Sequence, residues 1–181
     1  MIESKTAPWV EKGYEMVSDS GFSGLSVELI ARNVGKNKSS FYHHFGDLEV
    51  FKTALLSHHV DRAKHFAAKL EECESIRPGM IHVFLRYKPD FLFHKQLRIE
   101  RGDSECEKCF EEVHKLFESA IEETWAVYLQ LENQKLLART FLRLVSENFL
   151  LQITKENYLF DWLDDYLSDV SEMLAKLKPS G

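Results

Sequence analysis

Basic side chains gather in one short stretch of an otherwise acidic chain. The sequence has 181 residues and a formal net charge of -6, and residues 1–50 carry five Lys and Arg against seven Asp and Glu. Residues 29–46, however, contain Arg32, Lys36 and Lys38, two histidines and no acid. Contacts with phosphate groups need local positive potential, which a short segment can supply whatever the total charge. This stretch is therefore the candidate surface for binding a nucleic acid.

The same stretch places other hydrogen-bond donors beside the cations. In a helix, Phe41 and Phe45 would share one apolar face, and the polar side chains of Lys38, Ser39 and Tyr42 would point away from it. Lysine can donate to the O6 or N7 atom of guanine in the major groove. Hydroxyl groups and ring N–H groups suit the phosphate backbone. The pattern is typical of a short helix that reads DNA.

A second cluster could do different chemistry. His58, Asp61, Arg62 and His65 would share one face of a helix. That face could present metal ligands or an acid–base pair. A solvated helix face explains the same spacing, and we prefer that interpretation.

The cysteines suggest half of a zinc site. Cys106 and Cys109 are followed by His114, but the third cysteine, Cys73, is far away along the chain. We expect reduced thiols packed in the core, with redox sensing as the alternative. No P-loop, dinucleotide fingerprint, nucleophile elbow or paired-histidine motif occurs. We therefore expect no enzymatic activity, no catalytic residues, no metal and no cofactor.

The elements that must position these groups are predicted to be helices throughout. Hydrophobic residues make up 44% of the chain, which has only 8 Gly and 4 Pro, and no segment alternates like a strand. Apolar spacing predicts a helix over about 10–20. Ser26 and Asn37 are good N-caps for two short helices separated by Gly35. Two short helices joined by such a turn can place the second in the major groove.

Longer helices follow this N-terminal group. Apolar periodicity and the positions of proline and glycine predict them at about 48–73, 79–88, 90–101, 104–131, 134–156 and 160–177. Residues 1–10 contain no apolar signal segment, and no later stretch is long enough to span a bilayer. We expect a cytoplasmic protein with no membrane partner.

The N-terminal segment resembles a known family. Residues 21–35, GFSGLSVELIARNVG, and 41–45, FYHHF, closely resemble the DNA-binding domain of the tetracycline-repressor (TetR) family, over about residues 5–60. The resemblance implies an all-α chain with a three-helix, helix-turn-helix DNA-binding domain at 1–46. Residues 47–181 would form a helical effector-binding and dimerisation domain. By the same resemblance the core would contain Ile30, Ala31, Val34, Phe41 and Phe45.

The resemblance also implies which side chains meet DNA. Lys38 and Ser39 would approach base edges, and His43 could contact either a base or a phosphate. The family usually carries a lysine early in the fourth helix, where this chain has Leu48, so Lys36 or Lys52 would have to supply that charge. The phosphate backbone would be held by Ser26, Ser40, Tyr42 and His44, and the full predicted set is Ser26, Lys36, Lys38, Ser39, Ser40, Tyr42, His43 and His44.

The C-terminal part is expected to bind an effector and a second copy of the chain. In the resembled family the middle helices enclose an effector pocket, for which the candidates are Tyr87, Phe91, His94, His114, Trp125 and Gln152. The last two helices carry more apolar surface than one core can cover. The predicted dimer contacts are Leu144, Asn148, Leu151, Trp162, Tyr166, Val170 and Met173.

These features together predict a ligand-responsive transcriptional regulator. As a repressor, it would bind a palindromic operator in double-stranded DNA as a homodimer and be released by a small-molecule effector. One alternative is a dimeric helical protein-interaction module that has lost operator binding. Another is a metal-dependent enzyme that uses the His58 and His65 face.

Overall fold

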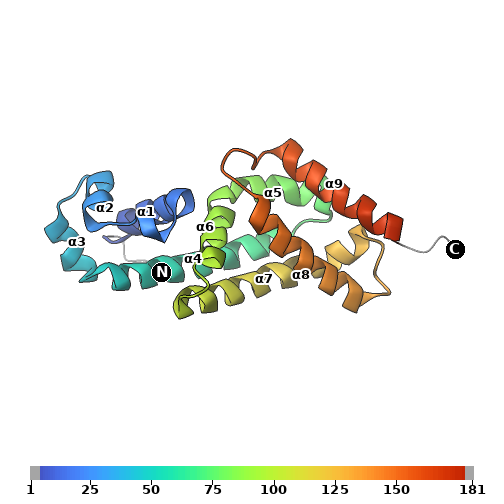
Figure 1. Cartoon of the computed structure of the whole chain (residues 1–181), viewed down its shortest axis with the longest axis horizontal. Helices are drawn as coiled ribbons and strands as arrows, with labels where there is room; N and C mark the ends of the chain where they lie inside the picture. The colour runs from blue at the N-terminus through green and yellow to red at the C-terminus, as the bar shows by residue number, and fades with distance from the viewer. Residues whose placement is uncertain (1–4, 178–181) are drawn as a thin grey trace. The chain divides into compact units, whose positions relative to one another are not determined.

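The computed structural model describes residues 5–177, which form helices and no strand (Figure 1). The α-helices are α1 (Ala7–Ser20), α2 (Val27–Val34), α3 (Lys38–Phe45), α4 (Leu48–Glu71), α5 (Ile81–Arg86), α6 (Lys88–Ile99), α7 (Ser104–Tyr128), α8 (Lys135–Gln152) and α9 (Phe160–Leu177), with short helical turns η1 (Phe22–Gly24) and η2 (Ile76–Met80). The predicted all-α class is confirmed. Within 5–177 no helix combines the length and apolarity needed to cross a membrane.

Several helix boundaries differ from the sequence predictions, and two of the differences have a local cause. Pro89 lies inside the first turn of α6, where its missing N–H costs no intrahelical hydrogen bond. α8 ends at Gln152 and not near residue 156, because Asn157 folds back on the chain. The Asn157 amide donates to the Gln152 carbonyl at 3.0 Å and accepts from the Thr154 N–H at 2.6 Å. A local side-chain cap therefore ends a helix that periodicity would extend.

The described chain forms two compact units. The first contains residues 5–63 and 89–113, which include α1, α2, α3 and α6 together with the beginnings of α4 and α7. The second contains residues 64–88 and 114–177. The division of function between residues 1–46 and 47–181 is a separate question and stays a prediction.

The first unit is held by large aromatic side chains. Trp9, Phe41, Phe51 and Phe93 are buried, and the ring of Phe41 lies 5.6 Å from that of Trp9 and 5.2 Å from that of Phe51. Gly13 allows α1 to approach α4, because a Cβ there would lie 2.4 Å from the Phe51 ring. α1 and α4 thus hold α3 from two sides.

The second unit has its own core. The Phe66 and Phe117 rings meet edge to face at 4.9 Å. Arg77 forms a two-pronged ion pair with Asp164, with both N···O distances at 2.6 Å, and ties η2 to α9. This unit includes α5, α8 and α9 and contains no part of the helix-turn-helix.

Candidate nucleic-acid interface

Two eight-residue helices, α2 and α3, form the candidate interface, and each starts at a side-chain cap. Ser26 Oγ accepts a hydrogen bond from the Leu29 N–H at 3.2 Å, and Asn37 Oδ1 accepts one from the Ser40 N–H at 2.8 Å. α2 ends at Gly35, whose φ of 70° lies in the left-handed region that glycine adopts most easily. These local signals fix where α3 begins and hence which residues occupy its first turn.

Buried side chains determine which face of α3 is exposed. Phe41 is fully buried and Phe45 nearly so, as the apolar pattern predicted. Phe45 packs against Phe51 of α4 with ring centroids 4.8 Å apart. Because an α-helix turns once every 3.6 residues, Tyr42 and His43, which follow Phe41, point outward, while His44 lies half-buried beside Trp9.

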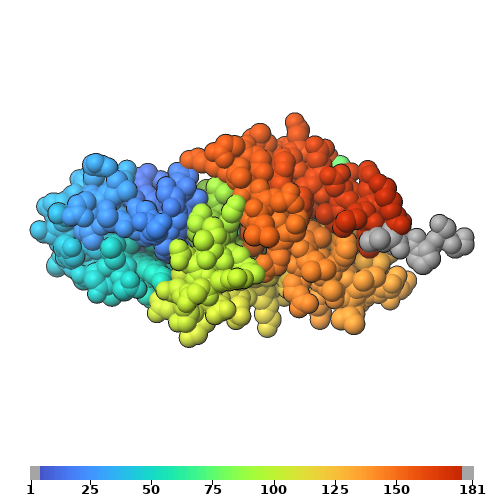
Figure 2. Space-filling view, in the orientation of Figure 1, coloured from blue at the N-terminus to red at the C-terminus, as the bar shows by residue number. Residues whose placement is uncertain are grey.

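All eight residues predicted to bind DNA keep exposed surface on α2, α3 or their flanking turns, drawn in blue to cyan in Figure 2. Tyr42 is 52% exposed. The half-buried members are Ser26, Ser40 and His44, and the exposed members are Lys36, Lys38, Ser39, Tyr42 and His43. Their roles toward DNA stay a prediction, but the structure leaves each of them reachable.

Glu28 is an interface residue that the sequence analysis missed. Its carboxylate lies 2.7 Å from Lys38 Nζ, and both side chains are exposed. Hydrogen bonding and attraction to Glu28 raise the pKa of Lys38, and Lys38 lowers the pKa of Glu28. The two residues are ten positions apart and meet across the turn, a pairing for which no local spacing rule exists. The best candidate for base readout is therefore held by an acid.

The environment of Leu48 narrows the choice of a substitute cation. Leu48 is half-buried and lines a small cavity of about 190 Å³ with Phe22 and Lys52. Lys52 Nζ is held 2.5 Å from Asp103 Oδ2, and only 15% of its side chain is exposed. Lys36 is exposed on the turn before α3. Of the two lysines considered as substitutes, Lys36 is the one free to reach a phosphate.

The six candidate effector residues are divided between the units: Phe91 and His94 lie in the first, and Tyr87, His114, Trp125 and Gln152 lie in the second. His94 is buried, and its Nδ1 atom is 3.3 Å from His59 Nε2. The indole N–H of Trp125 donates to the Ala138 carbonyl at 3.2 Å, so that group is already used. Gln152 is exposed on α8. A shared effector site for these six residues stays a prediction.

The predicted dimer residues differ in exposure. Leu144, Leu151 and Met173 are 61%, 71% and 50% exposed. Asn148 is exposed, and the stacked rings of Trp162 and Tyr166 are half-buried. Val170, by contrast, is only 7% exposed because it packs inside its own chain, so it belongs to the core. The other six stay a prediction for the dimer face.

The competing metal and thiol hypotheses gain no support. Within residues 5–177 no three His, Cys, Asp or Glu side chains are grouped so that they could hold a metal ion. Arg62, on the proposed metal-binding face, is paired with Asp90. Burial raises the pKa of Cys106 to about 11 and that of Cys109 to about 12. Thiols with such values are poor nucleophiles at neutral pH, as expected of packing cysteines.

Comparison with known proteins gives the same assignment. The family described as "Bacterial regulatory proteins, tetR family" matches residues 10–55. A TetR-family protein from Rhodococcus sp. has a similar structure, with a TM-score of 0.57, 18% identity and coverage of 95% of this chain and 97% of that one. A second TetR-family protein, from Mesorhizobium loti MAFF303099, has a TM-score of 0.55 and 14% identity, with 96% of this chain and 96% of that one covered.

No curated protein sequence matches the chain. At such low identity the structural similarity establishes the fold, and the family match over α1–α4 identifies the helix-turn-helix. Residues 10–55 therefore match the DNA-binding segment of the TetR family of bacterial regulatory proteins, and the chain has a fold similar to that of solved TetR-family proteins.

Proposed function

We propose that the protein is a ligand-responsive transcriptional repressor that binds a palindromic operator as a homodimer. The exposed first turn of α3 carries the proposal: Lys38 and Ser39 lie at its start, with Tyr42 one turn later. N-terminal residues of a recognition helix are those that reach base edges when the helix enters the major groove. Lys38 would read a guanine, and Tyr42 and Ser40 would hold phosphates.

A homodimer with two-fold symmetry would match an operator with the same symmetry. Leu144 and Leu151, two of the exposed leucines on α8, lie seven residues apart and so share a face. Met173 on α9 supplies a further exposed apolar group. Association of two chains through α8 and α9 would bury these groups and present two copies of α3 to two half-sites. The protein would act in the cytoplasm, where its operator is.

An effector of apolar character would release the operator. Such a ligand must prefer one of two dimer conformations, because a ligand that binds both equally shifts nothing. Reciprocity supplies the test, since any compound that releases DNA must bind less tightly when operator is present. Titrating a compound found by thermal stabilisation, with and without operator, measures that coupling.

Footprinting on the protein's own promoter region tests the central proposal. The expected result is a protected site with two-fold symmetry. A protein that stays dimeric but binds no genomic fragment above nonspecific level at low salt would instead favour the protein-interaction module.

Leu151→Asp tests the dimer face. This substitution should give a folded monomer in analytical ultracentrifugation, because it places a charge on an exposed apolar surface. Glu156→Asp is a control on an exposed polar position in the following loop. If the Leu151→Asp protein is folded and fully dimeric, the dimer interface does not lie on this face of α8. Val170→Asp is unsuitable, because a charge in the core would unfold the chain.

A further inference from the structure

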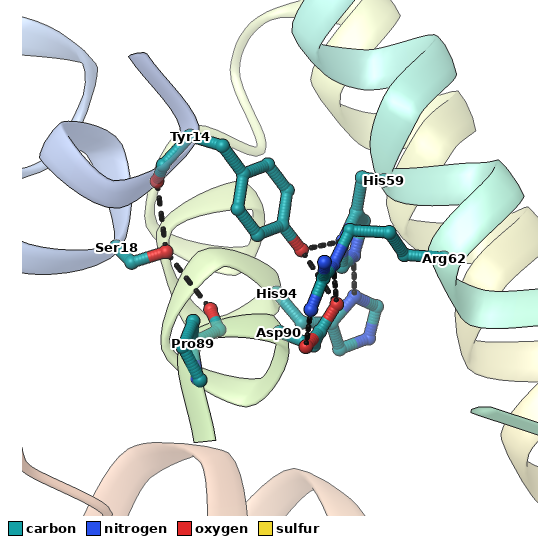
Figure 3. A network of polar contacts seen from close by, with 7 residues as sticks. All are labelled: Tyr14, Ser18, His59, Arg62, Pro89, Asp90 and His94. Atoms are coloured by element: carbon teal, nitrogen blue, oxygen red, sulfur yellow. Dashed lines mark hydrogen bonds and ion pairs between the residues drawn. The ribbon is translucent and has the colours of Figure 1, made fainter. Parts of the chain in front are cut away.

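A buried polar network joins α1, α4 and α6 within the first unit (Figure 3). The Tyr14 hydroxyl donates to Asp90 Oδ1 at 3.0 Å and lies 2.7 Å from His59 Nδ1. His59 Nε2 lies 3.3 Å from His94 Nδ1. Arg62 donates a hydrogen bond to each carboxylate oxygen of Asp90, at 2.5 and 2.7 Å. Tyr14, His59, Asp90 and His94 are all at most 3% exposed.

The contacts allow one arrangement of protons with neutral imidazoles. Because Tyr14 donates its single proton to Asp90, His59 must donate from Nδ1 to the tyrosine oxygen. His59 Nε2 then carries no proton and accepts from Nδ1 of His94. The chain of donors runs from α6 through α4 to α1 and ends at the Asp90–Arg62 ion pair. Each link depends on the next, so the network is formed as a whole or broken as a whole.

Further contacts seat α6 along α1. The Phe93 ring stacks on Tyr14 with centroids 4.3 Å apart and planes 8° apart. The Ser18 hydroxyl donates to the Pro89 carbonyl at 2.8 Å. At Gly21 a Cβ would lie 3.0 Å from the side-chain oxygen of Gln96. α6 therefore belongs to the same packed body as the helix-turn-helix.

The helices joined by this network are also those that hold α3. On α1, Trp9 packs against Phe41 of α3, and on α4, Phe51 packs against both Phe41 and Phe45. A movement of α6 would take Asp90 away from Tyr14 and Arg62 and take His94 away from His59, so α1 and α4 would lose the contacts that α6 makes with both of them. The support of α3 would then loosen.

We propose that this network is a latch that closes α6 onto α1 and α4, that the operator is bound with the latch closed, and that acid opens it. The inference rests on the proposed function and adds a regulatory role for Asp90, Tyr14 and His59 as positioning residues. A proton on His59 would place two cations, the buried His59 and the half-buried Arg62, around the single buried carboxylate of Asp90. The open state has no such conflict, since water can solvate the imidazolium.

The groups that face His59 come from three helices. They are Tyr14 from α1, His58 and Arg62 from α4, and Asp90 and His94 from α6. Burial first, then the charges of Arg62 and His58, lower the pKa of His59 to about 3. With an ordinary value of 6.5 in the open state, opening should become about thirtyfold more favourable between pH 8 and pH 5.

Tyr14→Phe is the sharpest test, because it removes one hydroxyl and keeps the stack on Phe93. We expect amide hydrogen exchange in α6 to accelerate about five- to tenfold and operator affinity to fall by at most the same factor. The matched control is Tyr158→Phe, which removes an equally buried hydroxyl in the second unit, bonded to the Phe84 carbonyl at 3.2 Å. This control should leave both α6 exchange and operator affinity unchanged.

His59→Gln tests the acid response separately from folding. Glutamine can accept from His94 and donate to Tyr14, so the latch should stay closed without a group that titrates. In the wild type, amide hydrogen exchange in α6, corrected for the intrinsic exchange rates, should become much faster as the pH falls from 8 to 5. In the variant the corrected exchange rate should not change over this range.

The possible results separate this inference from the proposed function. If the wild type binds no operator, the proposed function fails, and exchange in α6 alone still tests the latch. If the wild type binds but Tyr14→Phe retains wild-type affinity, the latch does not govern DNA binding and the inference is overturned. It is also overturned if His59→Gln and the wild type show the same dependence of α6 exchange on pH.

Discussion

Two carboxylate–cation pairs in the first unit have similar chemistry and opposite surroundings. Glu28 and Lys38 lie 2.7 Å apart with side chains 67% and 55% exposed. Asp90 and Arg62 form two bonds of 2.5 and 2.7 Å, and the Asp90 side chain is 2% exposed. Water and salt screen the first pair, so it contributes little to folding and can exchange partners. In the second pair the Asp90 carboxylate is shielded although 36% of the Arg62 side chain is exposed, so loss of the guanidinium would leave a buried charge without its partner.

The difference divides two roles between the pairs. A residue that must change partners when DNA arrives needs a weak, solvated ion pair, as Lys38 has. A contact that must hold helices in one arrangement needs a buried group whose hydrogen bonds are satisfied, as the Asp90 carboxylate is. The same charge chemistry thus serves recognition on the surface and positioning in the interior.

Asp90→Asn should have the largest effect, because Asp90 is the buried acceptor for both prongs of Arg62 and for the Tyr14 hydroxyl. We expect a loss of about 3 kcal/mol in the free energy of unfolding, measured by urea denaturation. Asp164→Asn is the matched control, since Asp164 pairs with Arg77 in the same two-pronged geometry but with side chains 30% and 32% exposed. Equal losses for the two variants would show that burial does not distinguish these ion pairs.

Acid should destabilise the protein through His59. The folded state resists protonation down to a pKa of about 3, while the unfolded chain takes up the proton near 6.5. Stability is therefore complete above about pH 6.5 and is lost as the pH falls toward 3, by about 2 kcal/mol at pH 5.

Denaturant unfolding as a function of pH measures this loss, and His59→Gln should remove most of it. The ion pair between Lys52 and Asp103 affects stability at lower pH, because hydrogen bonding to Lys52 lowers the pKa of Asp103 to about 2. A wild-type protein as stable at pH 5 as at pH 8 would contradict the assignment of a neutral, buried His59.

On the exposed side, Lys38→Ala and Tyr42→Ala should differ in kind. Tyr42→Ala should weaken binding to all duplexes by about tenfold, because it removes a phosphate contact. Lys38→Ala should cause a similar loss on the operator and also relax the preference at one or two base positions. Binding selections from randomised duplexes read both effects. If Lys38→Ala keeps the base preferences of the wild type, Lys38 does not take part in base readout.

Glu28→Gln should have the smallest effect. Releasing Lys38 should raise affinity for nonspecific duplex by less than about threefold and make binding slightly more dependent on salt. Urea denaturation should show no measurable change, because the pair is exposed. Glu49→Gln, on the first turn of α4, is a control with an exposed acid. A large loss of stability in Glu28→Gln would contradict the contrast between the two ion pairs.

Local signals predicted the two short helices and the turn between them, and the resemblance to the TetR family identified them as a helix-turn-helix. Ser26, Gly35 and Asn37 act within four residues of their own positions, and the Phe41 and Phe45 face follows from helical periodicity. Similar reasoning placed α4 and α7 to within a few residues. The exposed side of α3 could therefore be described before the structure was known.

Pairings between distant residues could not be predicted in this way. Glu28 meets Lys38 across a turn, and Tyr14 meets Asp90 across 76 positions of sequence. The sequence pointed to His58 and missed its neighbour His59, because burial depends on how α6 packs and not on local spacing. Val170 was assigned to a partner surface because apolar periodicity does not distinguish a core face from an interface.

The most direct test of α3 as a DNA-reading helix is the ratio of affinities for the operator and for a shuffled duplex of equal length. Competition titrations at two salt concentrations measure this ratio for the wild type and for Lys38→Ala. We predict that the wild type prefers its operator by about a thousandfold or more, that both affinities fall as salt rises, and that Lys38→Ala narrows the ratio. Equal affinity of the wild type for both duplexes at every salt concentration would contradict the account.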